Sequence, residues 1–157
     1  MRSLLFVPAD SEKKIAKALS VGADCLILDL EDSVAPAQKA QARPMAAAFI
    51  AQTRQKPQRP KLYVRINPID SGEWERDLAG VLASGPDGIL LPKARSAADV
   101  ARLAIALDHG EATAGIPHGQ TRIMALATEV PMAMLTLASY LDTSARLDAL
   151  TWGAEDL

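Results

Sequence analysis

Short apolar runs recur along the 157-residue chain, separated by Ala-rich segments with helical spacing. The runs are continuously apolar and do not alternate with polar residues, which is typical of parallel strands covered on both faces. They predict six strands, at residues 3–8, 24–30, 61–66, 88–92, 122–128 and 147–152. Because strands alternate with helices, the pattern predicts an α/β fold with right-handed crossovers.

The segments between the strands carry helix start and stop signals, among them Pro36 and Pro131 as first-turn prolines. The predicted helices cover residues 11–20, 36–52, 73–83, 96–107 and 131–140. We expect Pro44 to kink or restart the second of them, because proline removes a helix hydrogen bond. Residues 108–120 are rich in glycine and small polar residues and are expected to form a mobile loop.

An open doubly wound sheet and a (β/α)8 TIM barrel both fit this alternation. The position of the polar residues favours the barrel, because nearly every predicted strand carries them at its C-terminal end. They are Asp29, Glu31, Asp32, Arg65, Asn67, Lys93, Glu129 and Asp156. In a barrel these ends converge on one mouth, where active sites lie, whereas in an open sheet only those at a switch point meet. No Gly-rich phosphate loop follows the first strand, so a nucleotide-binding sheet has little support.

A whole barrel needs about 250 residues. We therefore expect residues 1–157 to form a single incomplete TIM-barrel domain that holds about the first six βα units, without the C-terminal strands and lid. The first and last strands would then be unpaired edges.

Composition narrows the class of protein. Apolar residues make up 49% and charged residues 23% of a chain with a net charge of −2, which indicates a soluble protein and gives no reason to expect nucleic acid or an anionic membrane as partner. The single cysteine, Cys25, lies in an apolar run and is expected to be a buried, reduced thiol. The apolar run Leu4 to Val7 is too short for a signal peptide, so we expect a cytoplasmic protein.

Two carboxylates, Glu129 and Asp156, end consecutive predicted strands and would be neighbours in a barrel. Carboxylates that close repel each other unless a cation lies between them, and Mg²⁺ is typically held by one or two carboxylates with waters and substrate oxygens. The alternative is local helix capping, by Glu129 of the helix that begins at Pro131 and by Asp156 of a later one.

The stretch "LDLEDSV" holds three acidic residues, with Asp29 and Glu31 on one strand face and Asp32 at the start of the loop. Asp32 or Ser33 could cap a helix ahead of Pro36, or the acids could support a metal, with Asp32 holding a metal-bound water. Arg65, at the end of an apolar strand, could form a structural ion pair or grip a carboxylate or thioester oxygen.

Other polar and aromatic side chains give weaker signals. We interpret Lys93 as a solvated or structural lysine. His109 and His118 have no metal-ligand partner at suitable spacing and are expected to be exposed and non-catalytic. Trp74 and Trp152 are expected to pack in the protein.

The motifs "RSLLFVPA", "GADCLILDLEDSV", "VRINP", "GPDGILLPKARSAADV", "ALATEVPMAML" and "LTWGAEDL" together resemble the citrate lyase β-subunit-like proteins. These belong to the HpcH/HpaI aldolase group of Mg²⁺-dependent barrel lyases that act on CoA thioesters. The resemblance covers the whole chain in order. Two departures are "FVPAD" where the family usually has "FVPGN", and "ATE" where it has "IET".

The resemblance implies roles for five residues. Glu129 and Asp156 match the Mg²⁺ ligands, Arg65 matches the arginine that binds the carbonyl or enolate oxygen, and Glu31 and Asp32 match the acidic pair that supports the metal's water shell and the substrate. Glu129 thereby also contributes to substrate binding.

The resemblance also implies an activity. It is Mg²⁺-dependent (or Mn²⁺-dependent) cleavage or formation of a 3-hydroxy-acyl-CoA thioester, such as malyl-, citramalyl- or citryl-CoA, with a keto acid and acetyl-CoA as the other side of the reaction. The alternatives are a pyruvate-type aldolase without CoA, or a non-catalytic fragment or interaction module. Family members form homo-oligomers, trimers or hexamers, and continue to a C-terminal segment that closes the site and carries an acid-base residue. The 157 residues alone are therefore expected to be inactive.

Overall fold

The computed structural model describes residues 1–154 and Asp156. Its centre is one six-stranded sheet in which every neighbouring pair of strands is parallel and the strands stand in sequence order. The strands are β1 (Leu4–Pro8), β2 (Cys25–Asp29), β3 (Lys61–Arg65), β4 (Gly88–Leu91), β5 (Arg122–Leu126) and β6 (Leu147–Thr151). All six lie within the ranges that the apolar runs predict.

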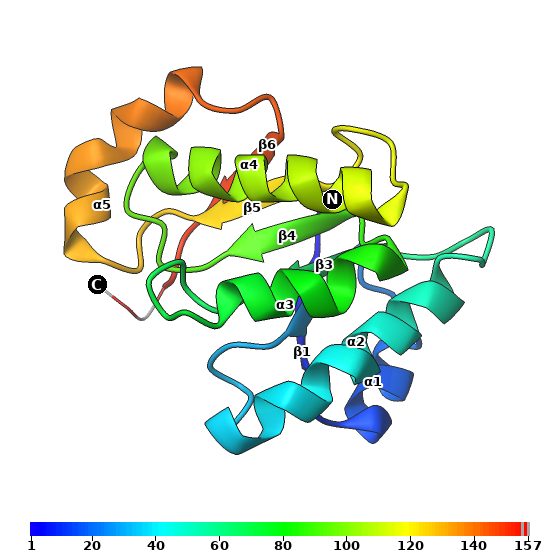
Figure 1. Cartoon of the computed structure of the whole chain (residues 1–157). Helices are drawn as coiled ribbons and strands as arrows, with labels where there is room; N and C mark the ends of the chain where they lie inside the picture. The colour runs from blue at the N-terminus through cyan, green and yellow to red at the C-terminus, as the bar shows by residue number, and fades with distance from the viewer. Residues whose placement is uncertain (155, 157) are drawn as a thin grey trace.

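Helices follow the strands in turn. They are α1 (Glu12–Ala18), α2 (Lys39–Thr53), α3 (Trp74–Val81), α4 (Ala97–Ala114) and α5 (Pro131–Thr136), with 3-10 turns η1 (Pro36–Gln38), η2 (Leu82–Ser84) and η3 (Leu137–Asp142). Figure 1 shows α2, α3 and α4 side by side in front of the strands. The sequence signals place the starts well: Ser11 and Ser96 cap α1 and α4, and Pro131 opens α5.

The two faces of the sheet bury different sets of side chains. One face packs against the helices through alternate strand residues such as Leu26, Val64 and Ile89. The other face carries a small apolar cluster made mainly by the strands themselves, with Cys25, Ile27, Tyr63, Leu90, Met124 and Leu126 buried in it. Helices on one face and a strand-lined interior on the other are the arrangement of a (β/α)8 barrel, since a doubly wound sheet carries helices on both faces.

The outer strands of the sheet, β1 and β6, are its least covered part. Leu4 and Phe6 of β1 pair in register with Cys25 and Ile27 of β2, so they lie on the inner face, yet both are more than two-fifths exposed. Cys25, their neighbour, is fully buried and free, as predicted.

Three expectations need correction. Helix α4 continues to Ala114, so residues 108–114 are not a loop; Glu111 is fully buried there, and Gly110 packs so tightly on Leu82 that a Cβ atom would clash. Of the two effects expected of Pro44, a kink or a restart, the restart is wrong: helix α2 runs through Pro44, because its buried face, which includes Ile50, holds the segment in the core.

The third correction concerns the tryptophans. Trp74 is buried, as expected, and Arg102 stacks on its ring at 5.1 Å. Trp152, by contrast, is 72% exposed, because it lies beyond the last residue of the outer strand β6 and no helix of the described residues covers it.

Candidate active site

The carboxyl ends of the strands bring most of the predicted site residues together. Asp29 and Arg65 are the last residues of β2 and β3 and are partners in the register of the sheet. Arg65 donates two hydrogen bonds to Asp29, from Nε to Oδ1 at 2.7 Å and from Nη2 to Oδ2 at 2.6 Å. The aspartate is fully buried, so this paired, bidentate geometry is what allows both charges to remain there.

Asp29 also shapes the turn that carries the other two acidic residues. Its oxygens accept from the main-chain amides of Glu31, at 2.9 Å, and Ser33, at 3.2 Å. Burial acts to raise the pKa of Asp29, but the bonds from Arg65 and Ser33 outweigh it and hold this pKa below its usual value. Asp29, and not Asp32, therefore fixes the turn after β2.

Glu31 lies between two cations. It is 3% exposed, with Oε2 3.1 Å from Arg65 Nη1 and Oε1 in an ion pair with Lys93 Nζ. Burial raises the pKa of Glu31 and the two cations oppose this rise. Among the described residues Oε2 has no hydrogen-bond partner of good geometry. Such a buried, under-satisfied carboxylate oxygen is typical of a functional site.

Lys93 is the unexpected member of the site. The ammonium contacts Glu31 and lies 3.3 Å from Asp32 Oδ2, while its main-chain amide donates to Glu129 Oε2 at 2.5 Å. Its φ of 51° is the only positive value at a non-glycine residue within the described part of the chain. Backbone strain of this kind is concentrated at functional sites. Sequence reasoning left Lys93 as a solvated or structural lysine; it is structural, and it joins three acids.

The predicted metal ligands Glu129 and Asp156 both lie over Gly153. A Cβ atom built on Gly153 would be 2.9 Å from Glu129 Cγ and closer still to Asp156 Oδ2. Burial raises the pKa of Glu129, and the negative charge of Asp156 adds to this rise. The two acids are therefore electrostatic neighbours, as the barrel model predicts. Glu155 and Leu157 of the same motif lie outside the described residues.

This donor set fits a hard divalent cation. Glu129 and Asp156 offer carboxylate oxygens only, and no cluster of three or more Asp, Glu, His or Cys side chains suited to a metal occurs in residues 1–154 and 156. Mg²⁺ is usually bound in this way, through one or two carboxylates with waters and substrate filling the octahedron, whereas structural zinc needs four protein ligands.

A second layer of polar residues supports the site from behind. Lys39 donates to the carbonyls of Leu30 and Glu31, at 2.8 and 2.9 Å, and to Asn67 Oδ1 at 2.6 Å. Buried Asp77 accepts from the amide and the side chain of Asn67, at 2.8 and 2.7 Å.

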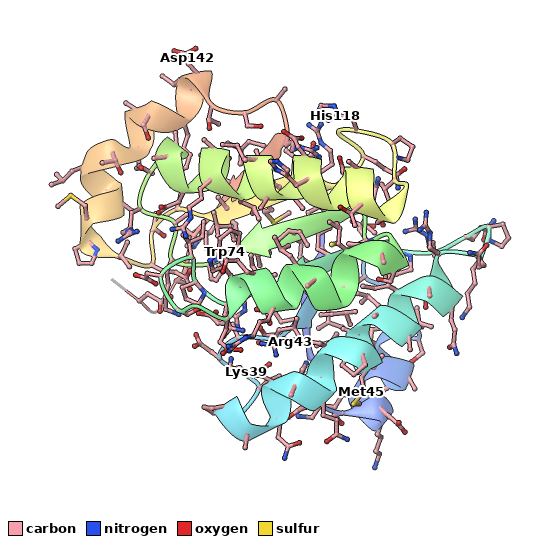
Figure 2. The ribbon with its side chains drawn as sticks, in the orientation of Figure 1. Lys39, Arg43, Met45, Trp74, His118 and Asp142 are labelled. Carbon is pink, nitrogen blue, oxygen red and sulfur yellow. The ribbon has the colours of Figure 1, made fainter. Side chains whose placement is uncertain are left out.

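Arg43 completes this layer, since its Nε donates to Asp77 Oδ1 at 2.8 Å. Figure 2 shows Lys39 and Arg43 close together on the first half of α2, beside α3. Sequence reasoning named Asn67 at the end of its strand but missed Lys39, Arg43 and Asp77. A signal was available for Asp77, which is a charged residue in the same helical stripe as the buried Trp74, Leu78 and Val81.

The histidines lie away from this site, and their predicted exposure is confirmed. Both are exposed: His109 is in α4, and His118, 79% exposed, contacts Asp108 at 2.9 Å in the loop after that helix. Figure 2 shows His118 at the opposite end of the molecule from Lys39.

Within the described residues no helix combines the length and apolarity that membrane crossing needs.

Comparison with known proteins identifies relatives over the whole chain. The model of the HpcH/HpaI aldolase/citrate lyase family matches residues 2–157. The citrate lyase subunit beta of Haemophilus influenzae is 33% identical over 155 residues, covering 99% of this chain and 52% of that protein. The human mitochondrial citramalyl-CoA lyase is 37% identical over 101 residues, covering 63% of this chain and 29% of that protein. The chain thus spans about half the length of the citrate lyase subunits it matches.

Solved structures show the same fold. A citrate lyase beta subunit from Mycobacterium tuberculosis, complexed with oxaloacetate and magnesium, superimposes with a TM-score of 0.72 at 34% identity, covering 98% of this chain and 58% of that one. A CitE protein from the same organism, complexed with magnesium, acetoacetate and coenzyme A, gives 0.69 at 34% identity, with coverage of 98% and 49%.

Proposed function

The chain belongs to the HpcH/HpaI aldolase/citrate lyase family, and from that premise we propose that it is a Mg²⁺-dependent carbon–carbon lyase. Its substrate would be a 3-hydroxy-acyl-CoA thioester such as malyl-, citramalyl- or citryl-CoA, cleaved to, or formed from, a keto acid and acetyl-CoA. The observation that carries the proposal is the pair Glu129 and Asp156 over Gly153. Nearby, Arg65 and Lys93 both form ion pairs with Glu31. The names of the relatives, a citrate lyase subunit and a citramalyl-CoA lyase, support the substrate class.

The proposed roles follow from the contacts. Glu129 and Asp156 would hold the ion, and Asp32, 66% exposed at the mouth, would hold one of its waters. A bound Mg²⁺ would lower the pKa of the substrate hydroxyl, so that its proton leaves near neutral pH. The deprotonated hydroxyl would become the carbonyl of the keto acid as the C–C bond breaks, and the electron pair of that bond would pass to the thioester carbonyl as an enolate. One proton, equivalent to the one lost by the hydroxyl, would then be added at the enolate carbon to give acetyl-CoA.

Arg65 is suited to the enolate oxygen. A guanidinium has five N–H donors. Asp29 takes two of them and Glu31 lies against a third, so two donors remain for a substrate oxygen. Because Asp29 and Phe6 hold the group from two sides, with the guanidinium carbon 4.8 Å from the phenyl ring centre, those donors are preorganised.

Acetyl-CoA release tests the proposal. Full-length protein is incubated with malyl-, citramalyl- and citryl-CoA, with Mg²⁺ or with EDTA, and the products are separated by mass spectrometry. We expect acetyl-CoA and the matching keto acid from one of them, with Mg²⁺ only, and none from Asp156→Asn. Cleavage of the free hydroxy acids at the same rate would instead indicate a pyruvate-type aldolase. No cleavage of any of these compounds by a folded, Mg²⁺-binding protein would indicate a non-catalytic module.

A further inference from the structure

Lys93 contacts acidic residues from two parts of the candidate site, the turn after β2 and the segment after β5. Its amide binds Glu129, the proposed metal ligand, at 2.5 Å, and its ammonium lies between Glu31 and Asp32. The ammonium is thus an internal cation set between two carboxylates. The Lys93 side chain is 35% exposed, so it lies at the edge of the candidate site and remains in contact with solvent.

The charges around Lys93 do not cancel. Five carboxylates gather here, from Asp29, Glu31, Asp32, Glu129 and Asp156, with Arg65 as the other cation near them. Arg65 pairs with Asp29 and Glu31, whereas Lys93, within the described part of the chain, is the cation that contacts both Glu31 and Asp32. Without it these two acids form a second oxygen-donor pair that would itself attract a divalent ion.

We infer that Lys93 is a positioning residue that confines the divalent ion to Glu129 and Asp156, by orienting Glu129 through its amide and by occupying the place between Glu31 and Asp32 with its ammonium. The inference rests on the proposed function, because it takes Glu129 and Asp156 as the ligands. The left-handed backbone of Lys93 fits this role, since one residue has to direct its amide and its side chain to different strands.

Counting bound ions tests the inference without any activity assay. Mn²⁺ binding to the full-length protein is followed by the paramagnetic resonance signal of free Mn²⁺. The wild type is expected to bind one ion. Lys93→Met, which keeps the aliphatic stem and loses the charge, is expected to bind two. Lys93→Arg, which keeps the positive charge, should bind one ion. The double variant Lys93→Met with Glu31→Gln should also bind one. Lys13→Met, an exposed lysine of α1, is the matched control and should bind one.

A second variant guards against misfolding. Lys93→Gly removes the ammonium, and glycine adopts a φ of 51° without strain. It should also bind two ions, with circular dichroism unchanged. One ion of unchanged affinity in both Lys93→Met and Lys93→Gly would overturn the inference.

The outcomes separate this inference from the proposed function. If the wild type binds one ion that Asp156→Asn abolishes, while the Lys93 variants behave like wild type, the metal site stands and the role of Lys93 is wrong. If the wild type binds none but Lys93→Met binds one that Glu31→Gln removes, the role of Lys93 stands and the assignment of Glu129 and Asp156 is wrong. No binding in any variant rejects both.

Discussion

Asp29 and Arg65 end adjacent strands, face each other in register, and share two hydrogen bonds of 2.7 and 2.6 Å. Arg65 is therefore not a free cation awaiting substrate. Two of its five N–H donors bond to Asp29 and a third lies against Glu31, so these contacts fix the orientation of the other two. The pair converts a flexible side chain into a rigid one, which is what stabilisation of a developing charge requires.

Arg65→Lys tests this rigid orientation. Lysine lacks the planar fork, so it cannot keep both bonds to Asp29 and also reach a substrate oxygen. We expect kcat and kcat/KM to fall together by about 10²- to 10³-fold, as when an oxyanion donor is removed, while Mn²⁺ affinity stays unchanged. Steady-state kinetics and Mn²⁺ titration measure this, with the exposed Arg76→Lys as control. A rise in KM alone would mean that Arg65 binds ground state and transition state equally.

Glu129→Ala and Asp156→Ala test the metal ligands. Each removes one of two carboxylates that face the space over Gly153. Mn²⁺ affinity should weaken well over tenfold in either variant, a loss of more than about 1.4 kcal/mol. Asp32→Ala should weaken it less, because Asp32 is expected to act through a bound water. Isothermal titration with Mn²⁺ gives the three values, and unchanged affinity in Glu129→Ala would refute the assignment.

Lys39→Met tests the layer behind the site. The ammonium serves three acceptors, on Leu30, Glu31 and Asn67, so its loss leaves buried oxygens unpaired. We expect the free energy of unfolding to fall by about 1–3 kcal/mol and kcat/KM to fall with it. Urea unfolding and kinetics measure the two effects. Lys13→Met, on the exposed side of α1, should change neither; a Lys39→Met protein of wild-type stability would contradict the role.

Glu111 predicts how stability depends on pH. It lies buried between Arg146, at 2.6 and 2.9 Å, and the amides of Gly119 and Thr121. Burial alone would raise the pKa of Glu111, but these bonds lower it to about 2. Because the pKa is lower in the folded state, the stabilisation is complete above the ordinary value near 4.5 and is lost as the pH falls toward 2. It corresponds to about 3 kcal/mol.

Urea unfolding of wild type and Glu111→Gln at several pH values measures this contribution. The difference in unfolding free energy should be largest at pH 7 and shrink steadily below pH 4.5. Glu75→Gln, an exposed acid of α3, should run parallel to wild type. A difference that stays constant from pH 7 to pH 3 would show that Glu111 is not held by its charge.

The strand positions and the grouping of charged residues at the strand ends could be predicted from sequence for one reason. Buried parallel strands are apolar, so charged residues such as Arg65 and Glu129 stand out where each strand ends. The length of α4 could not be predicted, because glycine in the helix is favourable only where Gly110 meets Leu82, a contact made by another helical segment. The contacts of Lys39 and Lys93 depend on three or more elements meeting, and no local pattern encodes them.

The bare α-carbon of Gly153 has a further consequence. A methyl group there would clash with the end of the Asp156 side chain and with the Cγ of Glu129, so these side chains would have to shift. One added methyl would therefore displace the two proposed metal ligands from their present positions. A Gly153→Ala variant would then keep both acids and still lose the proposed metal site. Residue 153, as much as the two acids, would then decide whether the proposed metal site can form.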